Sequence, residues 1–147
     1  MNYEEFLQGK IVVAPVSGFE IGPEQVNKAL KPHQRDAVMW AVKGGRRGLF
    51  EAFGLGKTVQ ELEWCRLVAE HEGGKCLIVL PLGVRQEFTR DAVELLGMEP
   101  PQYVKTAGEA RAARGKILLT NYERVRDGDI DPRDFVGAAL DEASVLR

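Results

Sequence analysis

The sequence predicts an α/β fold in which helices cover both faces of a mainly parallel β-sheet. Short apolar runs of strand length alternate with stretches of helical apolar spacing, and glycines mark the boundaries between them. The strand candidates are apolar at nearly every position, which is typical of strands buried between two helical layers. With 147 residues, 44% hydrophobic and 29% charged, the chain suits one globular domain.

The chain begins with an irregular segment and then a helix. Residues 1–23 mix short apolar pieces with prolines and glycines, so we interpret them as an N-terminal extension of a domain that covers residues 24–147. The apolar spacing becomes helical over residues 25–42. Pro32 suits the first turn of a helix, and the glycine pair at 44–45 is expected to end it.

Two strand–helix units follow. Residues 48–53 are predicted to form a buried strand, and a glycine turn leads from it into a helix that ends at the glycine pair 73–74. Residues 76–80 form the next apolar strand, followed by a second helix. The faces expected to be buried are Val59, Leu62, Cys65 and Ala69 in the first helix and Val84, Phe88, Ala92 and Leu95 in the second.

The last part of the chain adds three more strands. A third strand is predicted around residues 103–104, and the capping-box spacing of Thr106 and Glu109 predicts a short helix through Arg114. Residues 116–120 form the fourth strand and residues 136–140 the fifth. The sheet therefore has five expected strands, each buried on both faces.

Composition excludes several classes of protein. The net charge of −2 gives no overall basic excess, so any nucleic-acid contact must be local. The two cysteines lie in apolar stretches, which favours two buried thiols in a reducing compartment. The chain holds no apolar run near the roughly 20 residues that span a bilayer and its start lacks a signal peptide, so we expect a cytoplasmic protein without a membrane partner. Two histidines cannot make a zinc site alone, so a metal ion would need oxygen ligands.

A phosphate-binding loop is the sharpest chemical signal. The sequence EAFGLGKT at residues 51–58 follows a predicted strand and opens a helix, which is the context of a phosphate loop. Lys57 would reach the β- and γ-phosphates, and the Thr58 hydroxyl would coordinate Mg²⁺. The general motif has a glycine where Glu51 stands, and the alternative is a glycine turn with an exposed lysine. The expected nucleotide-binding residues of this loop are Gly54, Leu55, Gly56, Lys57 and Thr58.

A carboxylate pair follows the fifth strand. Asp141 and Glu142 come directly after the apolar run that ends at Leu140, in a Walker-B arrangement. Asp141 would hold Mg²⁺, and Glu142 would orient and activate the water that attacks the γ-phosphate. Alone, such a pair would be interpreted as a solvated loop, and the upstream phosphate loop favours the catalytic interpretation with Lys57, Asp141 and Glu142 as the catalytic residues.

Five segments in order carry a family resemblance. They are LKPHQRDAVMW at 30–40, FGLGKT at 53–58, LIVLPLGV at 77–84, LLTNYE at 118–123 and DEAS at 141–144. Together they resemble the first RecA-like lobe of superfamily-two helicases with DEAD/DEAH-type motifs, and most of all the Swi/Snf-type translocases, with phage-encoded proteins the nearest kind. The resemblance covers residues 30–147. Ser144 stands where DEAH-type proteins carry histidine, which leaves open how the ATP state is signalled.

The resemblance implies a fold, a reaction and partners. It implies a three-layer RecA-like P-loop NTPase domain that binds ATP with Mg²⁺, with Gln34 contacting adenine and an acidic residue tolerated at Glu51. It also implies DNA as a partner, expected to be duplex and contacted mainly through its phosphate backbone. The nucleic-acid residues carried over are Pro81, Leu82, Gly83, Thr120 and Asn121.

The related motors supply arginine fingers from a second RecA-like lobe of the same full-length chain. An arginine finger contributes about 10³–10⁵ in rate. The chain stops six residues after Asp141, so we interpret it as an incomplete first lobe that binds nucleotide and turns it over very slowly. As a DNA-dependent ATPase, helicase or translocase, the complete protein would act in the cytoplasm of a bacterial or phage-infected cell.

Two other functions stay open from the sequence. One is a P-loop NTPase of another class, such as a small kinase, although no arginine-bearing lid is evident after the phosphate loop. The other is a non-catalytic nucleotide- or DNA-binding module, because a fold alone does not establish function. Trp40 and Trp64 are expected to pack helices onto the sheet, with a place near adenine as the alternative for Trp40.

Overall fold

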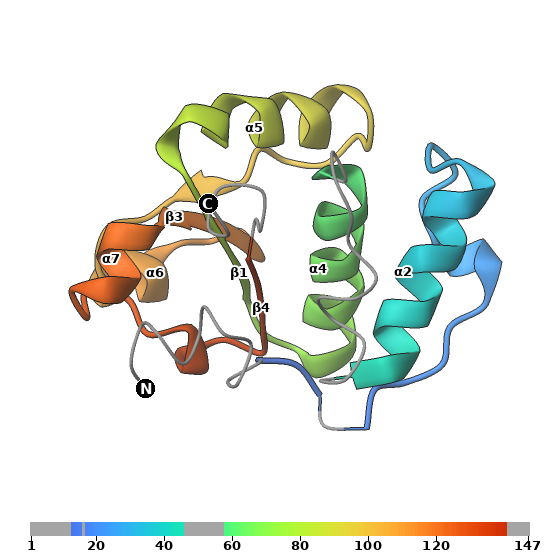
Figure 1. Cartoon of the computed structure of the whole chain (residues 1–147), viewed down its shortest axis with the longest axis horizontal. Helices are drawn as coiled ribbons and strands as arrows, with labels where there is room; N and C mark the ends of the chain where they lie inside the picture. Colours follow the sequence, from blue (N-terminus) through green and yellow to red (C-terminus); the bar gives the residue numbers. More distant parts are fainter. Residues whose placement is uncertain (1–12, 16, 46–57, 141–147) are drawn as a thin grey trace.

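The structure, a computed structural model, describes residues 13–15, 17–45 and 58–140 (Figure 1). The predicted strand at 48–53, the phosphate loop before Thr58, and the pair Asp141 and Glu142 lie outside the described residues. In chain order the elements are η1 (Pro23–Gln25), α2 (Pro32–Gly44), α4 (Thr58–Glu72), β1 (Cys76–Leu80), η3 (Leu82–Val84), α5 (Arg85–Glu94), β2 (Gln102–Tyr103), α6 (Ala107–Ala112), β3 (Ile117–Asn121), α7 (Tyr122–Arg126), η4 (Pro132–Asp134) and β4 (Gly137–Leu140).

The sheet of the described residues has four strands in the order β2-β3-β1-β4, all parallel. Central β1 pairs with β3 on one side, with Cys76 opposite Ile117, and with β4 on the other, with Cys76 opposite Gly137. Parallel neighbours need crossover connections, and the helices between the strands supply them. The predicted α/β class and parallel sheet are therefore confirmed for this part of the chain.

Alternate residues of β1 face two separate cores. Ile78 and Leu80 pack with α2, α4 and α5, while Leu77 and Val79 pack with α6 and α7. In Figure 1, α4 and then α2 lie on one side of the sheet, and α6 and α7 lie on the other. Because side chains alternate across a strand, each face of this apolar strand buries against its own helical layer.

Helix α4 is buried around nearly its whole circumference. The predicted face is buried at Leu62, Cys65 and Ala69, but the expectation of a single buried face is wrong, because polar Gln60 and Glu63 are also buried. The helix lies between the sheet, α2 and α5, so three surfaces cover it at once (Figure 1). Amphipathic spacing alone cannot reveal a helix that is enclosed in this way.

Helix α5 follows the prediction until its last turn. Phe88 and Ala92 are buried and Val84 is half-buried, but Leu95 is 54% exposed and Leu96 takes the buried position. The prediction for Leu95 is wrong because the helix ends at its tenth residue. Beyond that point, helical spacing no longer decides which side chain faces the core.

The described part of the N-terminal extension packs against the domain. Gly18 has a φ of +65°, and a Cβ there would lie 2.3 Å from the Lys43 carbonyl oxygen, so only glycine fits this close approach. The next residue, Phe19, stacks on His71 at the end of α4, with ring centroids 3.7 Å apart. Further upstream, the Val13 carbonyl accepts a hydrogen bond of 2.8 Å from Ala138 in β4.

The two tryptophans differ in burial, whereas both cysteines are buried. Trp64 is buried as predicted, whereas Trp40 is 49% exposed on α2, so the packing role predicted for Trp40 is wrong. Cys65 and Cys76 are both buried and unpaired, which confirms the predicted thiols. Burial raises the pKa of the Cys65 thiol, because the interior disfavours the thiolate.

None of the helices within the described ranges is both long and apolar enough to cross a membrane.

Candidate functional site

Strand ends and a helix start meet at one edge of the sheet. Leu80, the last residue of β1, pairs with Asn121, the last residue of β3, and Val79 pairs with Leu140 at the end of β4. In Figure 1 the first turn of α4 lies toward this same side. Ligands of open parallel sheets bind outside the carboxyl ends of the strands, so this edge is the candidate site.

Thr58 is the phosphate-loop residue that the structure describes. It is the first residue of the fifteen-residue helix α4 and is buried, with 8% of its surface exposed. The amino end of such a helix carries partial positive charge, which favours an anion. The other residues of the predicted nucleotide and magnesium site lie outside the described ranges: Gly54, Leu55, Gly56, Lys57, Asp141 and Glu142.

Gln34 lies in the first turn of α2 and is half-buried. Its side-chain Oε1 accepts a hydrogen bond of 2.9 Å from the Lys31 backbone N–H, so the oxygen completes the amino end of the helix. Among the described residues, none hydrogen-bonds to the amide nitrogen of Gln34. That nitrogen is the part of the side chain left to donate to a ligand.

The segment after β1 is accessible at the same edge. Pro81 is half-buried, while Leu82 and Gly83 are exposed, with 54% of Leu82 open to solvent. Arg85 follows, and its guanidinium carbon lies 4.4 Å from the centre of the Tyr103 ring. A cation over an aromatic face is held there by the charge distribution of the ring.

Thr120 and Asn121 are held within the protein. Thr120 is fully buried and its hydroxyl donates to the Val104 carbonyl at 2.9 Å, so this hydroxyl is not exposed toward a phosphate, in contrast to the contact that the resemblance implies. The amide oxygen of Asn121 accepts from the Tyr103 hydroxyl at 2.8 Å, and its nitrogen donates to Glu123. These side chains join β2, β3 and α7 at the candidate edge.

Gln60 is a polar residue near this site that the sequence analysis missed. It lies in the first turn of α4, two residues after Thr58, with 2% of its surface exposed. Its Oε1 is buried and has no hydrogen-bond partner among the residues that the structure describes. A buried acceptor without a partner costs about 1–3 kcal/mol, and such costs are concentrated at functional sites. The available signal was a polar residue at a core position just after the phosphate loop.

The charged side chain of Arg124, just after β3, has a partner close by in the sequence. Arg124 in α7 pairs with Asp129 at 3.1 Å, and the hydrogen bond that Arg124 donates to this aspartate raises the pKa of the arginine. Within the described ranges there is no group of three or more His, Cys, Asp or Glu side chains able to hold a metal ion. The proposed magnesium ligands are not such a group, since one is the hydroxyl of Thr58 and the other, Asp141, is outside those ranges.

No protein-family model matches this sequence, and no curated protein matches it either. The described part of the chain is an α/β protein with a four-stranded parallel sheet, and the carboxyl ends of β1, β3 and β4 lie at one edge of it.

Proposed function

We propose that the chain is the RecA-like ATP-binding lobe of a DNA-dependent ATPase, a helicase or translocase. The observation that carries the proposal is the position of Thr58. It opens α4 at the edge where β1, β3 and β4 end, and the sequence GLGK directly precedes it. A glycine-rich loop between a strand and a helix start is an arrangement that binds phosphates.

The ATP site is proposed from residues with distinct roles. The charge of Lys57 stabilises the β- and γ-phosphates, and Thr58 and Asp141 supply oxygen ligands, which Mg²⁺ prefers. Bound Mg²⁺ neutralises charge on the phosphates. Glu142 follows Asp141 in sequence and is proposed to orient the attacking water and accept its proton.

Gln34 is proposed to contact the base through its amide nitrogen. Its oxygen already accepts from the Lys31 N–H, so the nitrogen would donate to a ring nitrogen of adenine. Guanine also carries an acceptor at N7. Gln34 is therefore expected to discriminate between adenine and guanine less strongly than an amide that presents both its nitrogen and its oxygen to the base.

The nucleic-acid contact is proposed at the accessible loop after β1. Pro81, Leu82 and Gly83 present backbone and apolar surface there, and backbone N–H groups are common donors to phosphate. Asn121 lies opposite Leu80 at the end of β3 and, like Thr120, already has hydrogen-bond partners within the protein. DNA remains the proposed partner, together with a second RecA-like lobe that supplies arginine fingers.

Calorimetric titration of the chain with Mg-ATP and Mg-ADP tests the proposal. We expect binding that Lys57→Ala abolishes and that Lys28→Ala preserves, because Lys28 is an exposed lysine elsewhere on the surface. Unchanged affinity in Lys57→Ala, or no binding by the wild-type chain, would argue against an ATP site here. Hydrolysis is expected to be very slow, so rapid DNA-stimulated turnover by this chain would contradict the requirement for a second lobe.

Two variants of Gln34 separate base contact from helix capping. Gln34→Glu keeps an oxygen that can accept from Lys31 but lacks the donor nitrogen, whereas Gln34→Ala removes both. Weaker ATP binding in both variants supports the base contact. If Gln34→Glu binds as the wild type does and only Gln34→Ala is impaired, the side chain acts as a helix cap alone.

A further inference from the structure

A pocket lies at the opposite edge of the sheet from the proposed nucleotide site. Gly74 and Lys75 precede β1 and Val136 precedes β4, so the pocket opens at the amino ends of these strands. The remaining lining residues come from α6 and from the segment around η4, and the cavity volume is about 490 Å³. This volume lies within the roughly 300–1,000 Å³ of small-molecule sites.

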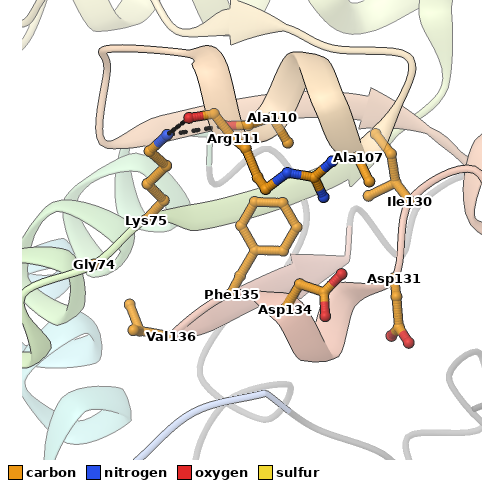
Figure 2. Close-up of a pocket in the computed structure, with 10 residues that line it drawn as sticks. All are labelled: Gly74, Lys75, Ala107, Ala110, Arg111, Ile130, Asp131, Asp134, Phe135 and Val136. Carbon is orange, nitrogen blue, oxygen red and sulfur yellow. Dashed lines mark hydrogen bonds between the residues drawn. The ribbon is translucent and has the colours of Figure 1, made fainter.

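Two of the charged residues in the pocket already have hydrogen-bond partners within the protein. Lys75 Nζ donates to the carbonyls of Ala110 at 2.8 Å and Arg111 at 3.1 Å, near the carboxyl end of α6 (Figure 2). It also donates to the Ala113 carbonyl at 2.6 Å. Asp131 accepts from the Arg133 guanidinium at 3.0 Å, and this hydrogen bond lowers the pKa of Asp131. These partners stabilise both charges, so neither one needs a ligand.

Arg111 and Asp134 are the remaining charges. Across the described part of the chain, neither side chain has a hydrogen-bond or ion-pair partner, and the two do not pair with each other. Figure 2 shows the Arg111 guanidinium and the Asp134 carboxylate on opposite sides of the Phe135 ring, with Ile130 facing the same space. The pocket therefore offers a cation and an anion, separated by an apolar wall.

We propose that this pocket binds a free α-amino acid with an aromatic or branched apolar side chain. Its carboxylate would accept the paired N–H groups of Arg111, its ammonium group would donate to Asp134, and its side chain would lie against Phe135 and Ile130. Only a small zwitterion brings both charges together with an apolar body. The terminus of a peptide carries one of the two charges beside its last side chain, so it satisfies only half of the pocket.

Titration of the ¹⁵N-labelled chain with L-phenylalanine or L-leucine, followed by NMR, tests this proposal. We expect saturable shifts of the amides of Arg111, Asp134 and Phe135. As comparators, 3-phenylpropionate lacks the ammonium group and phenethylamine lacks the carboxylate, so each is expected to bind at least tenfold more weakly. Absence of saturable shifts with both amino acids, or equal binding by either comparator, would overturn the proposal.

Variants test the two charges separately. Arg111→Gln and Asp134→Asn are each expected to weaken binding of L-phenylalanine at least tenfold. Both side chains are exposed, so the variants should fold, which thermal melting by circular dichroism checks. Arg114→Gln is the matched control, because it removes an exposed arginine near α6 that does not line the pocket. Wild-type affinity in both Arg111→Gln and Asp134→Asn would overturn the assigned contacts.

Discussion

The hydroxyl of Tyr103 donates a hydrogen bond to the Oδ1 of Asn121 at 2.8 Å, joining β2 to the last residue of β3. Asn121 in turn donates to Glu123 in α7, and Arg85 from α5 lies over the Tyr103 ring. Side chains from four elements are thus fixed at the edge proposed to contact nucleic acid. Tyr103 organises this edge although it belongs to none of the sequence motifs.

Removal of this hydroxyl should cost stability without disturbing the ring. In Tyr103→Phe, the Arg85 contact remains and the donor to Asn121 is lost, so we expect a loss of about 1 kcal/mol in the free energy of unfolding. Urea unfolding measures it. Tyr103→Leu, which removes the ring contact as well, should lose more, and equal stability of Tyr103→Phe and the wild type would show that the hydrogen bond contributes nothing.

Replacement of Gln60 should stabilise the protein. Gln60→Met keeps the approximate size and shape of the side chain and removes the buried Oε1, which has no hydrogen-bond partner within the described ranges. Because that acceptor is desolvated without compensation, we expect a gain of about 1 kcal/mol in the free energy of unfolding. Urea midpoints of the two proteins provide the comparison. A clear loss of stability would mean that the amide makes contacts that outweigh its unpaired oxygen.

Gly137 is required where β4 passes close to α4. A Cβ at this position would lie 2.9 Å from Cys76 Sγ and 3.1 Å from both Trp64 Cη2 and Val68 Cγ1. These neighbours are buried, so Gly137→Ala should overpack the core and cost about 1–3 kcal/mol, measured by chemical denaturation. In Gly108→Ala, the new Cβ would meet nothing nearer than 3.8 Å, so this control should be neutral or slightly stabilising. Equal effects of the two substitutions would contradict the packing argument.

Local sequence signals predicted most of the described fold. The apolar run of β1, the glycine at 73 and the Thr106 cap each act within a few residues, and the structure has β1, the end of α4 and the start of α6 where these signals place them. The resulting parallel sheet follows from strands that are apolar throughout.

Contacts between distant residues could not be predicted in the same way. The Thr120 hydroxyl, interpreted as a phosphate contact, donates instead to Val104, sixteen residues earlier. Buried Glu63 accepts from the backbone of Asn27, thirty-six residues away. The residues next to a buried polar side chain do not indicate its distant hydrogen-bond partner. The sequence therefore suggested which edge of the sheet holds the candidate site, but not which side chains there already have partners within the protein.

The pair formed by Glu63 and Arg66 supports the N-terminal segment against α4. Glu63 is fully buried and accepts from Arg66 Nε at 2.8 Å and from the Asn27 N–H at 2.7 Å. Arg66 also donates to the Gln25 carbonyl at 2.9 Å. The hydrogen bonds that Arg66 donates to Glu63 raise the pKa of Arg66 above its already high ordinary value. A group whose pKa is raised on folding contributes stability that is lost only as the pH rises through that pKa. Arg66 should therefore add no pH dependence to the free energy of unfolding between pH 5 and about pH 10.

Loss of either partner should therefore be costly. Arg66→Met leaves the Glu63 carboxylate buried without its cation, and removal of one member of a buried pair costs about 3–5 kcal/mol. A double-mutant cycle with Glu63→Gln, followed by urea unfolding, should give a double variant less destabilised than the sum of the single ones. Glu70→Gln is the matched control, because the exposed Glu70 pairs with the same arginine at 3.1 Å and should cost less than about 1 kcal/mol. Similar losses for Arg66→Met and Glu70→Gln would show that burial of Glu63 does not set the strength of this contact.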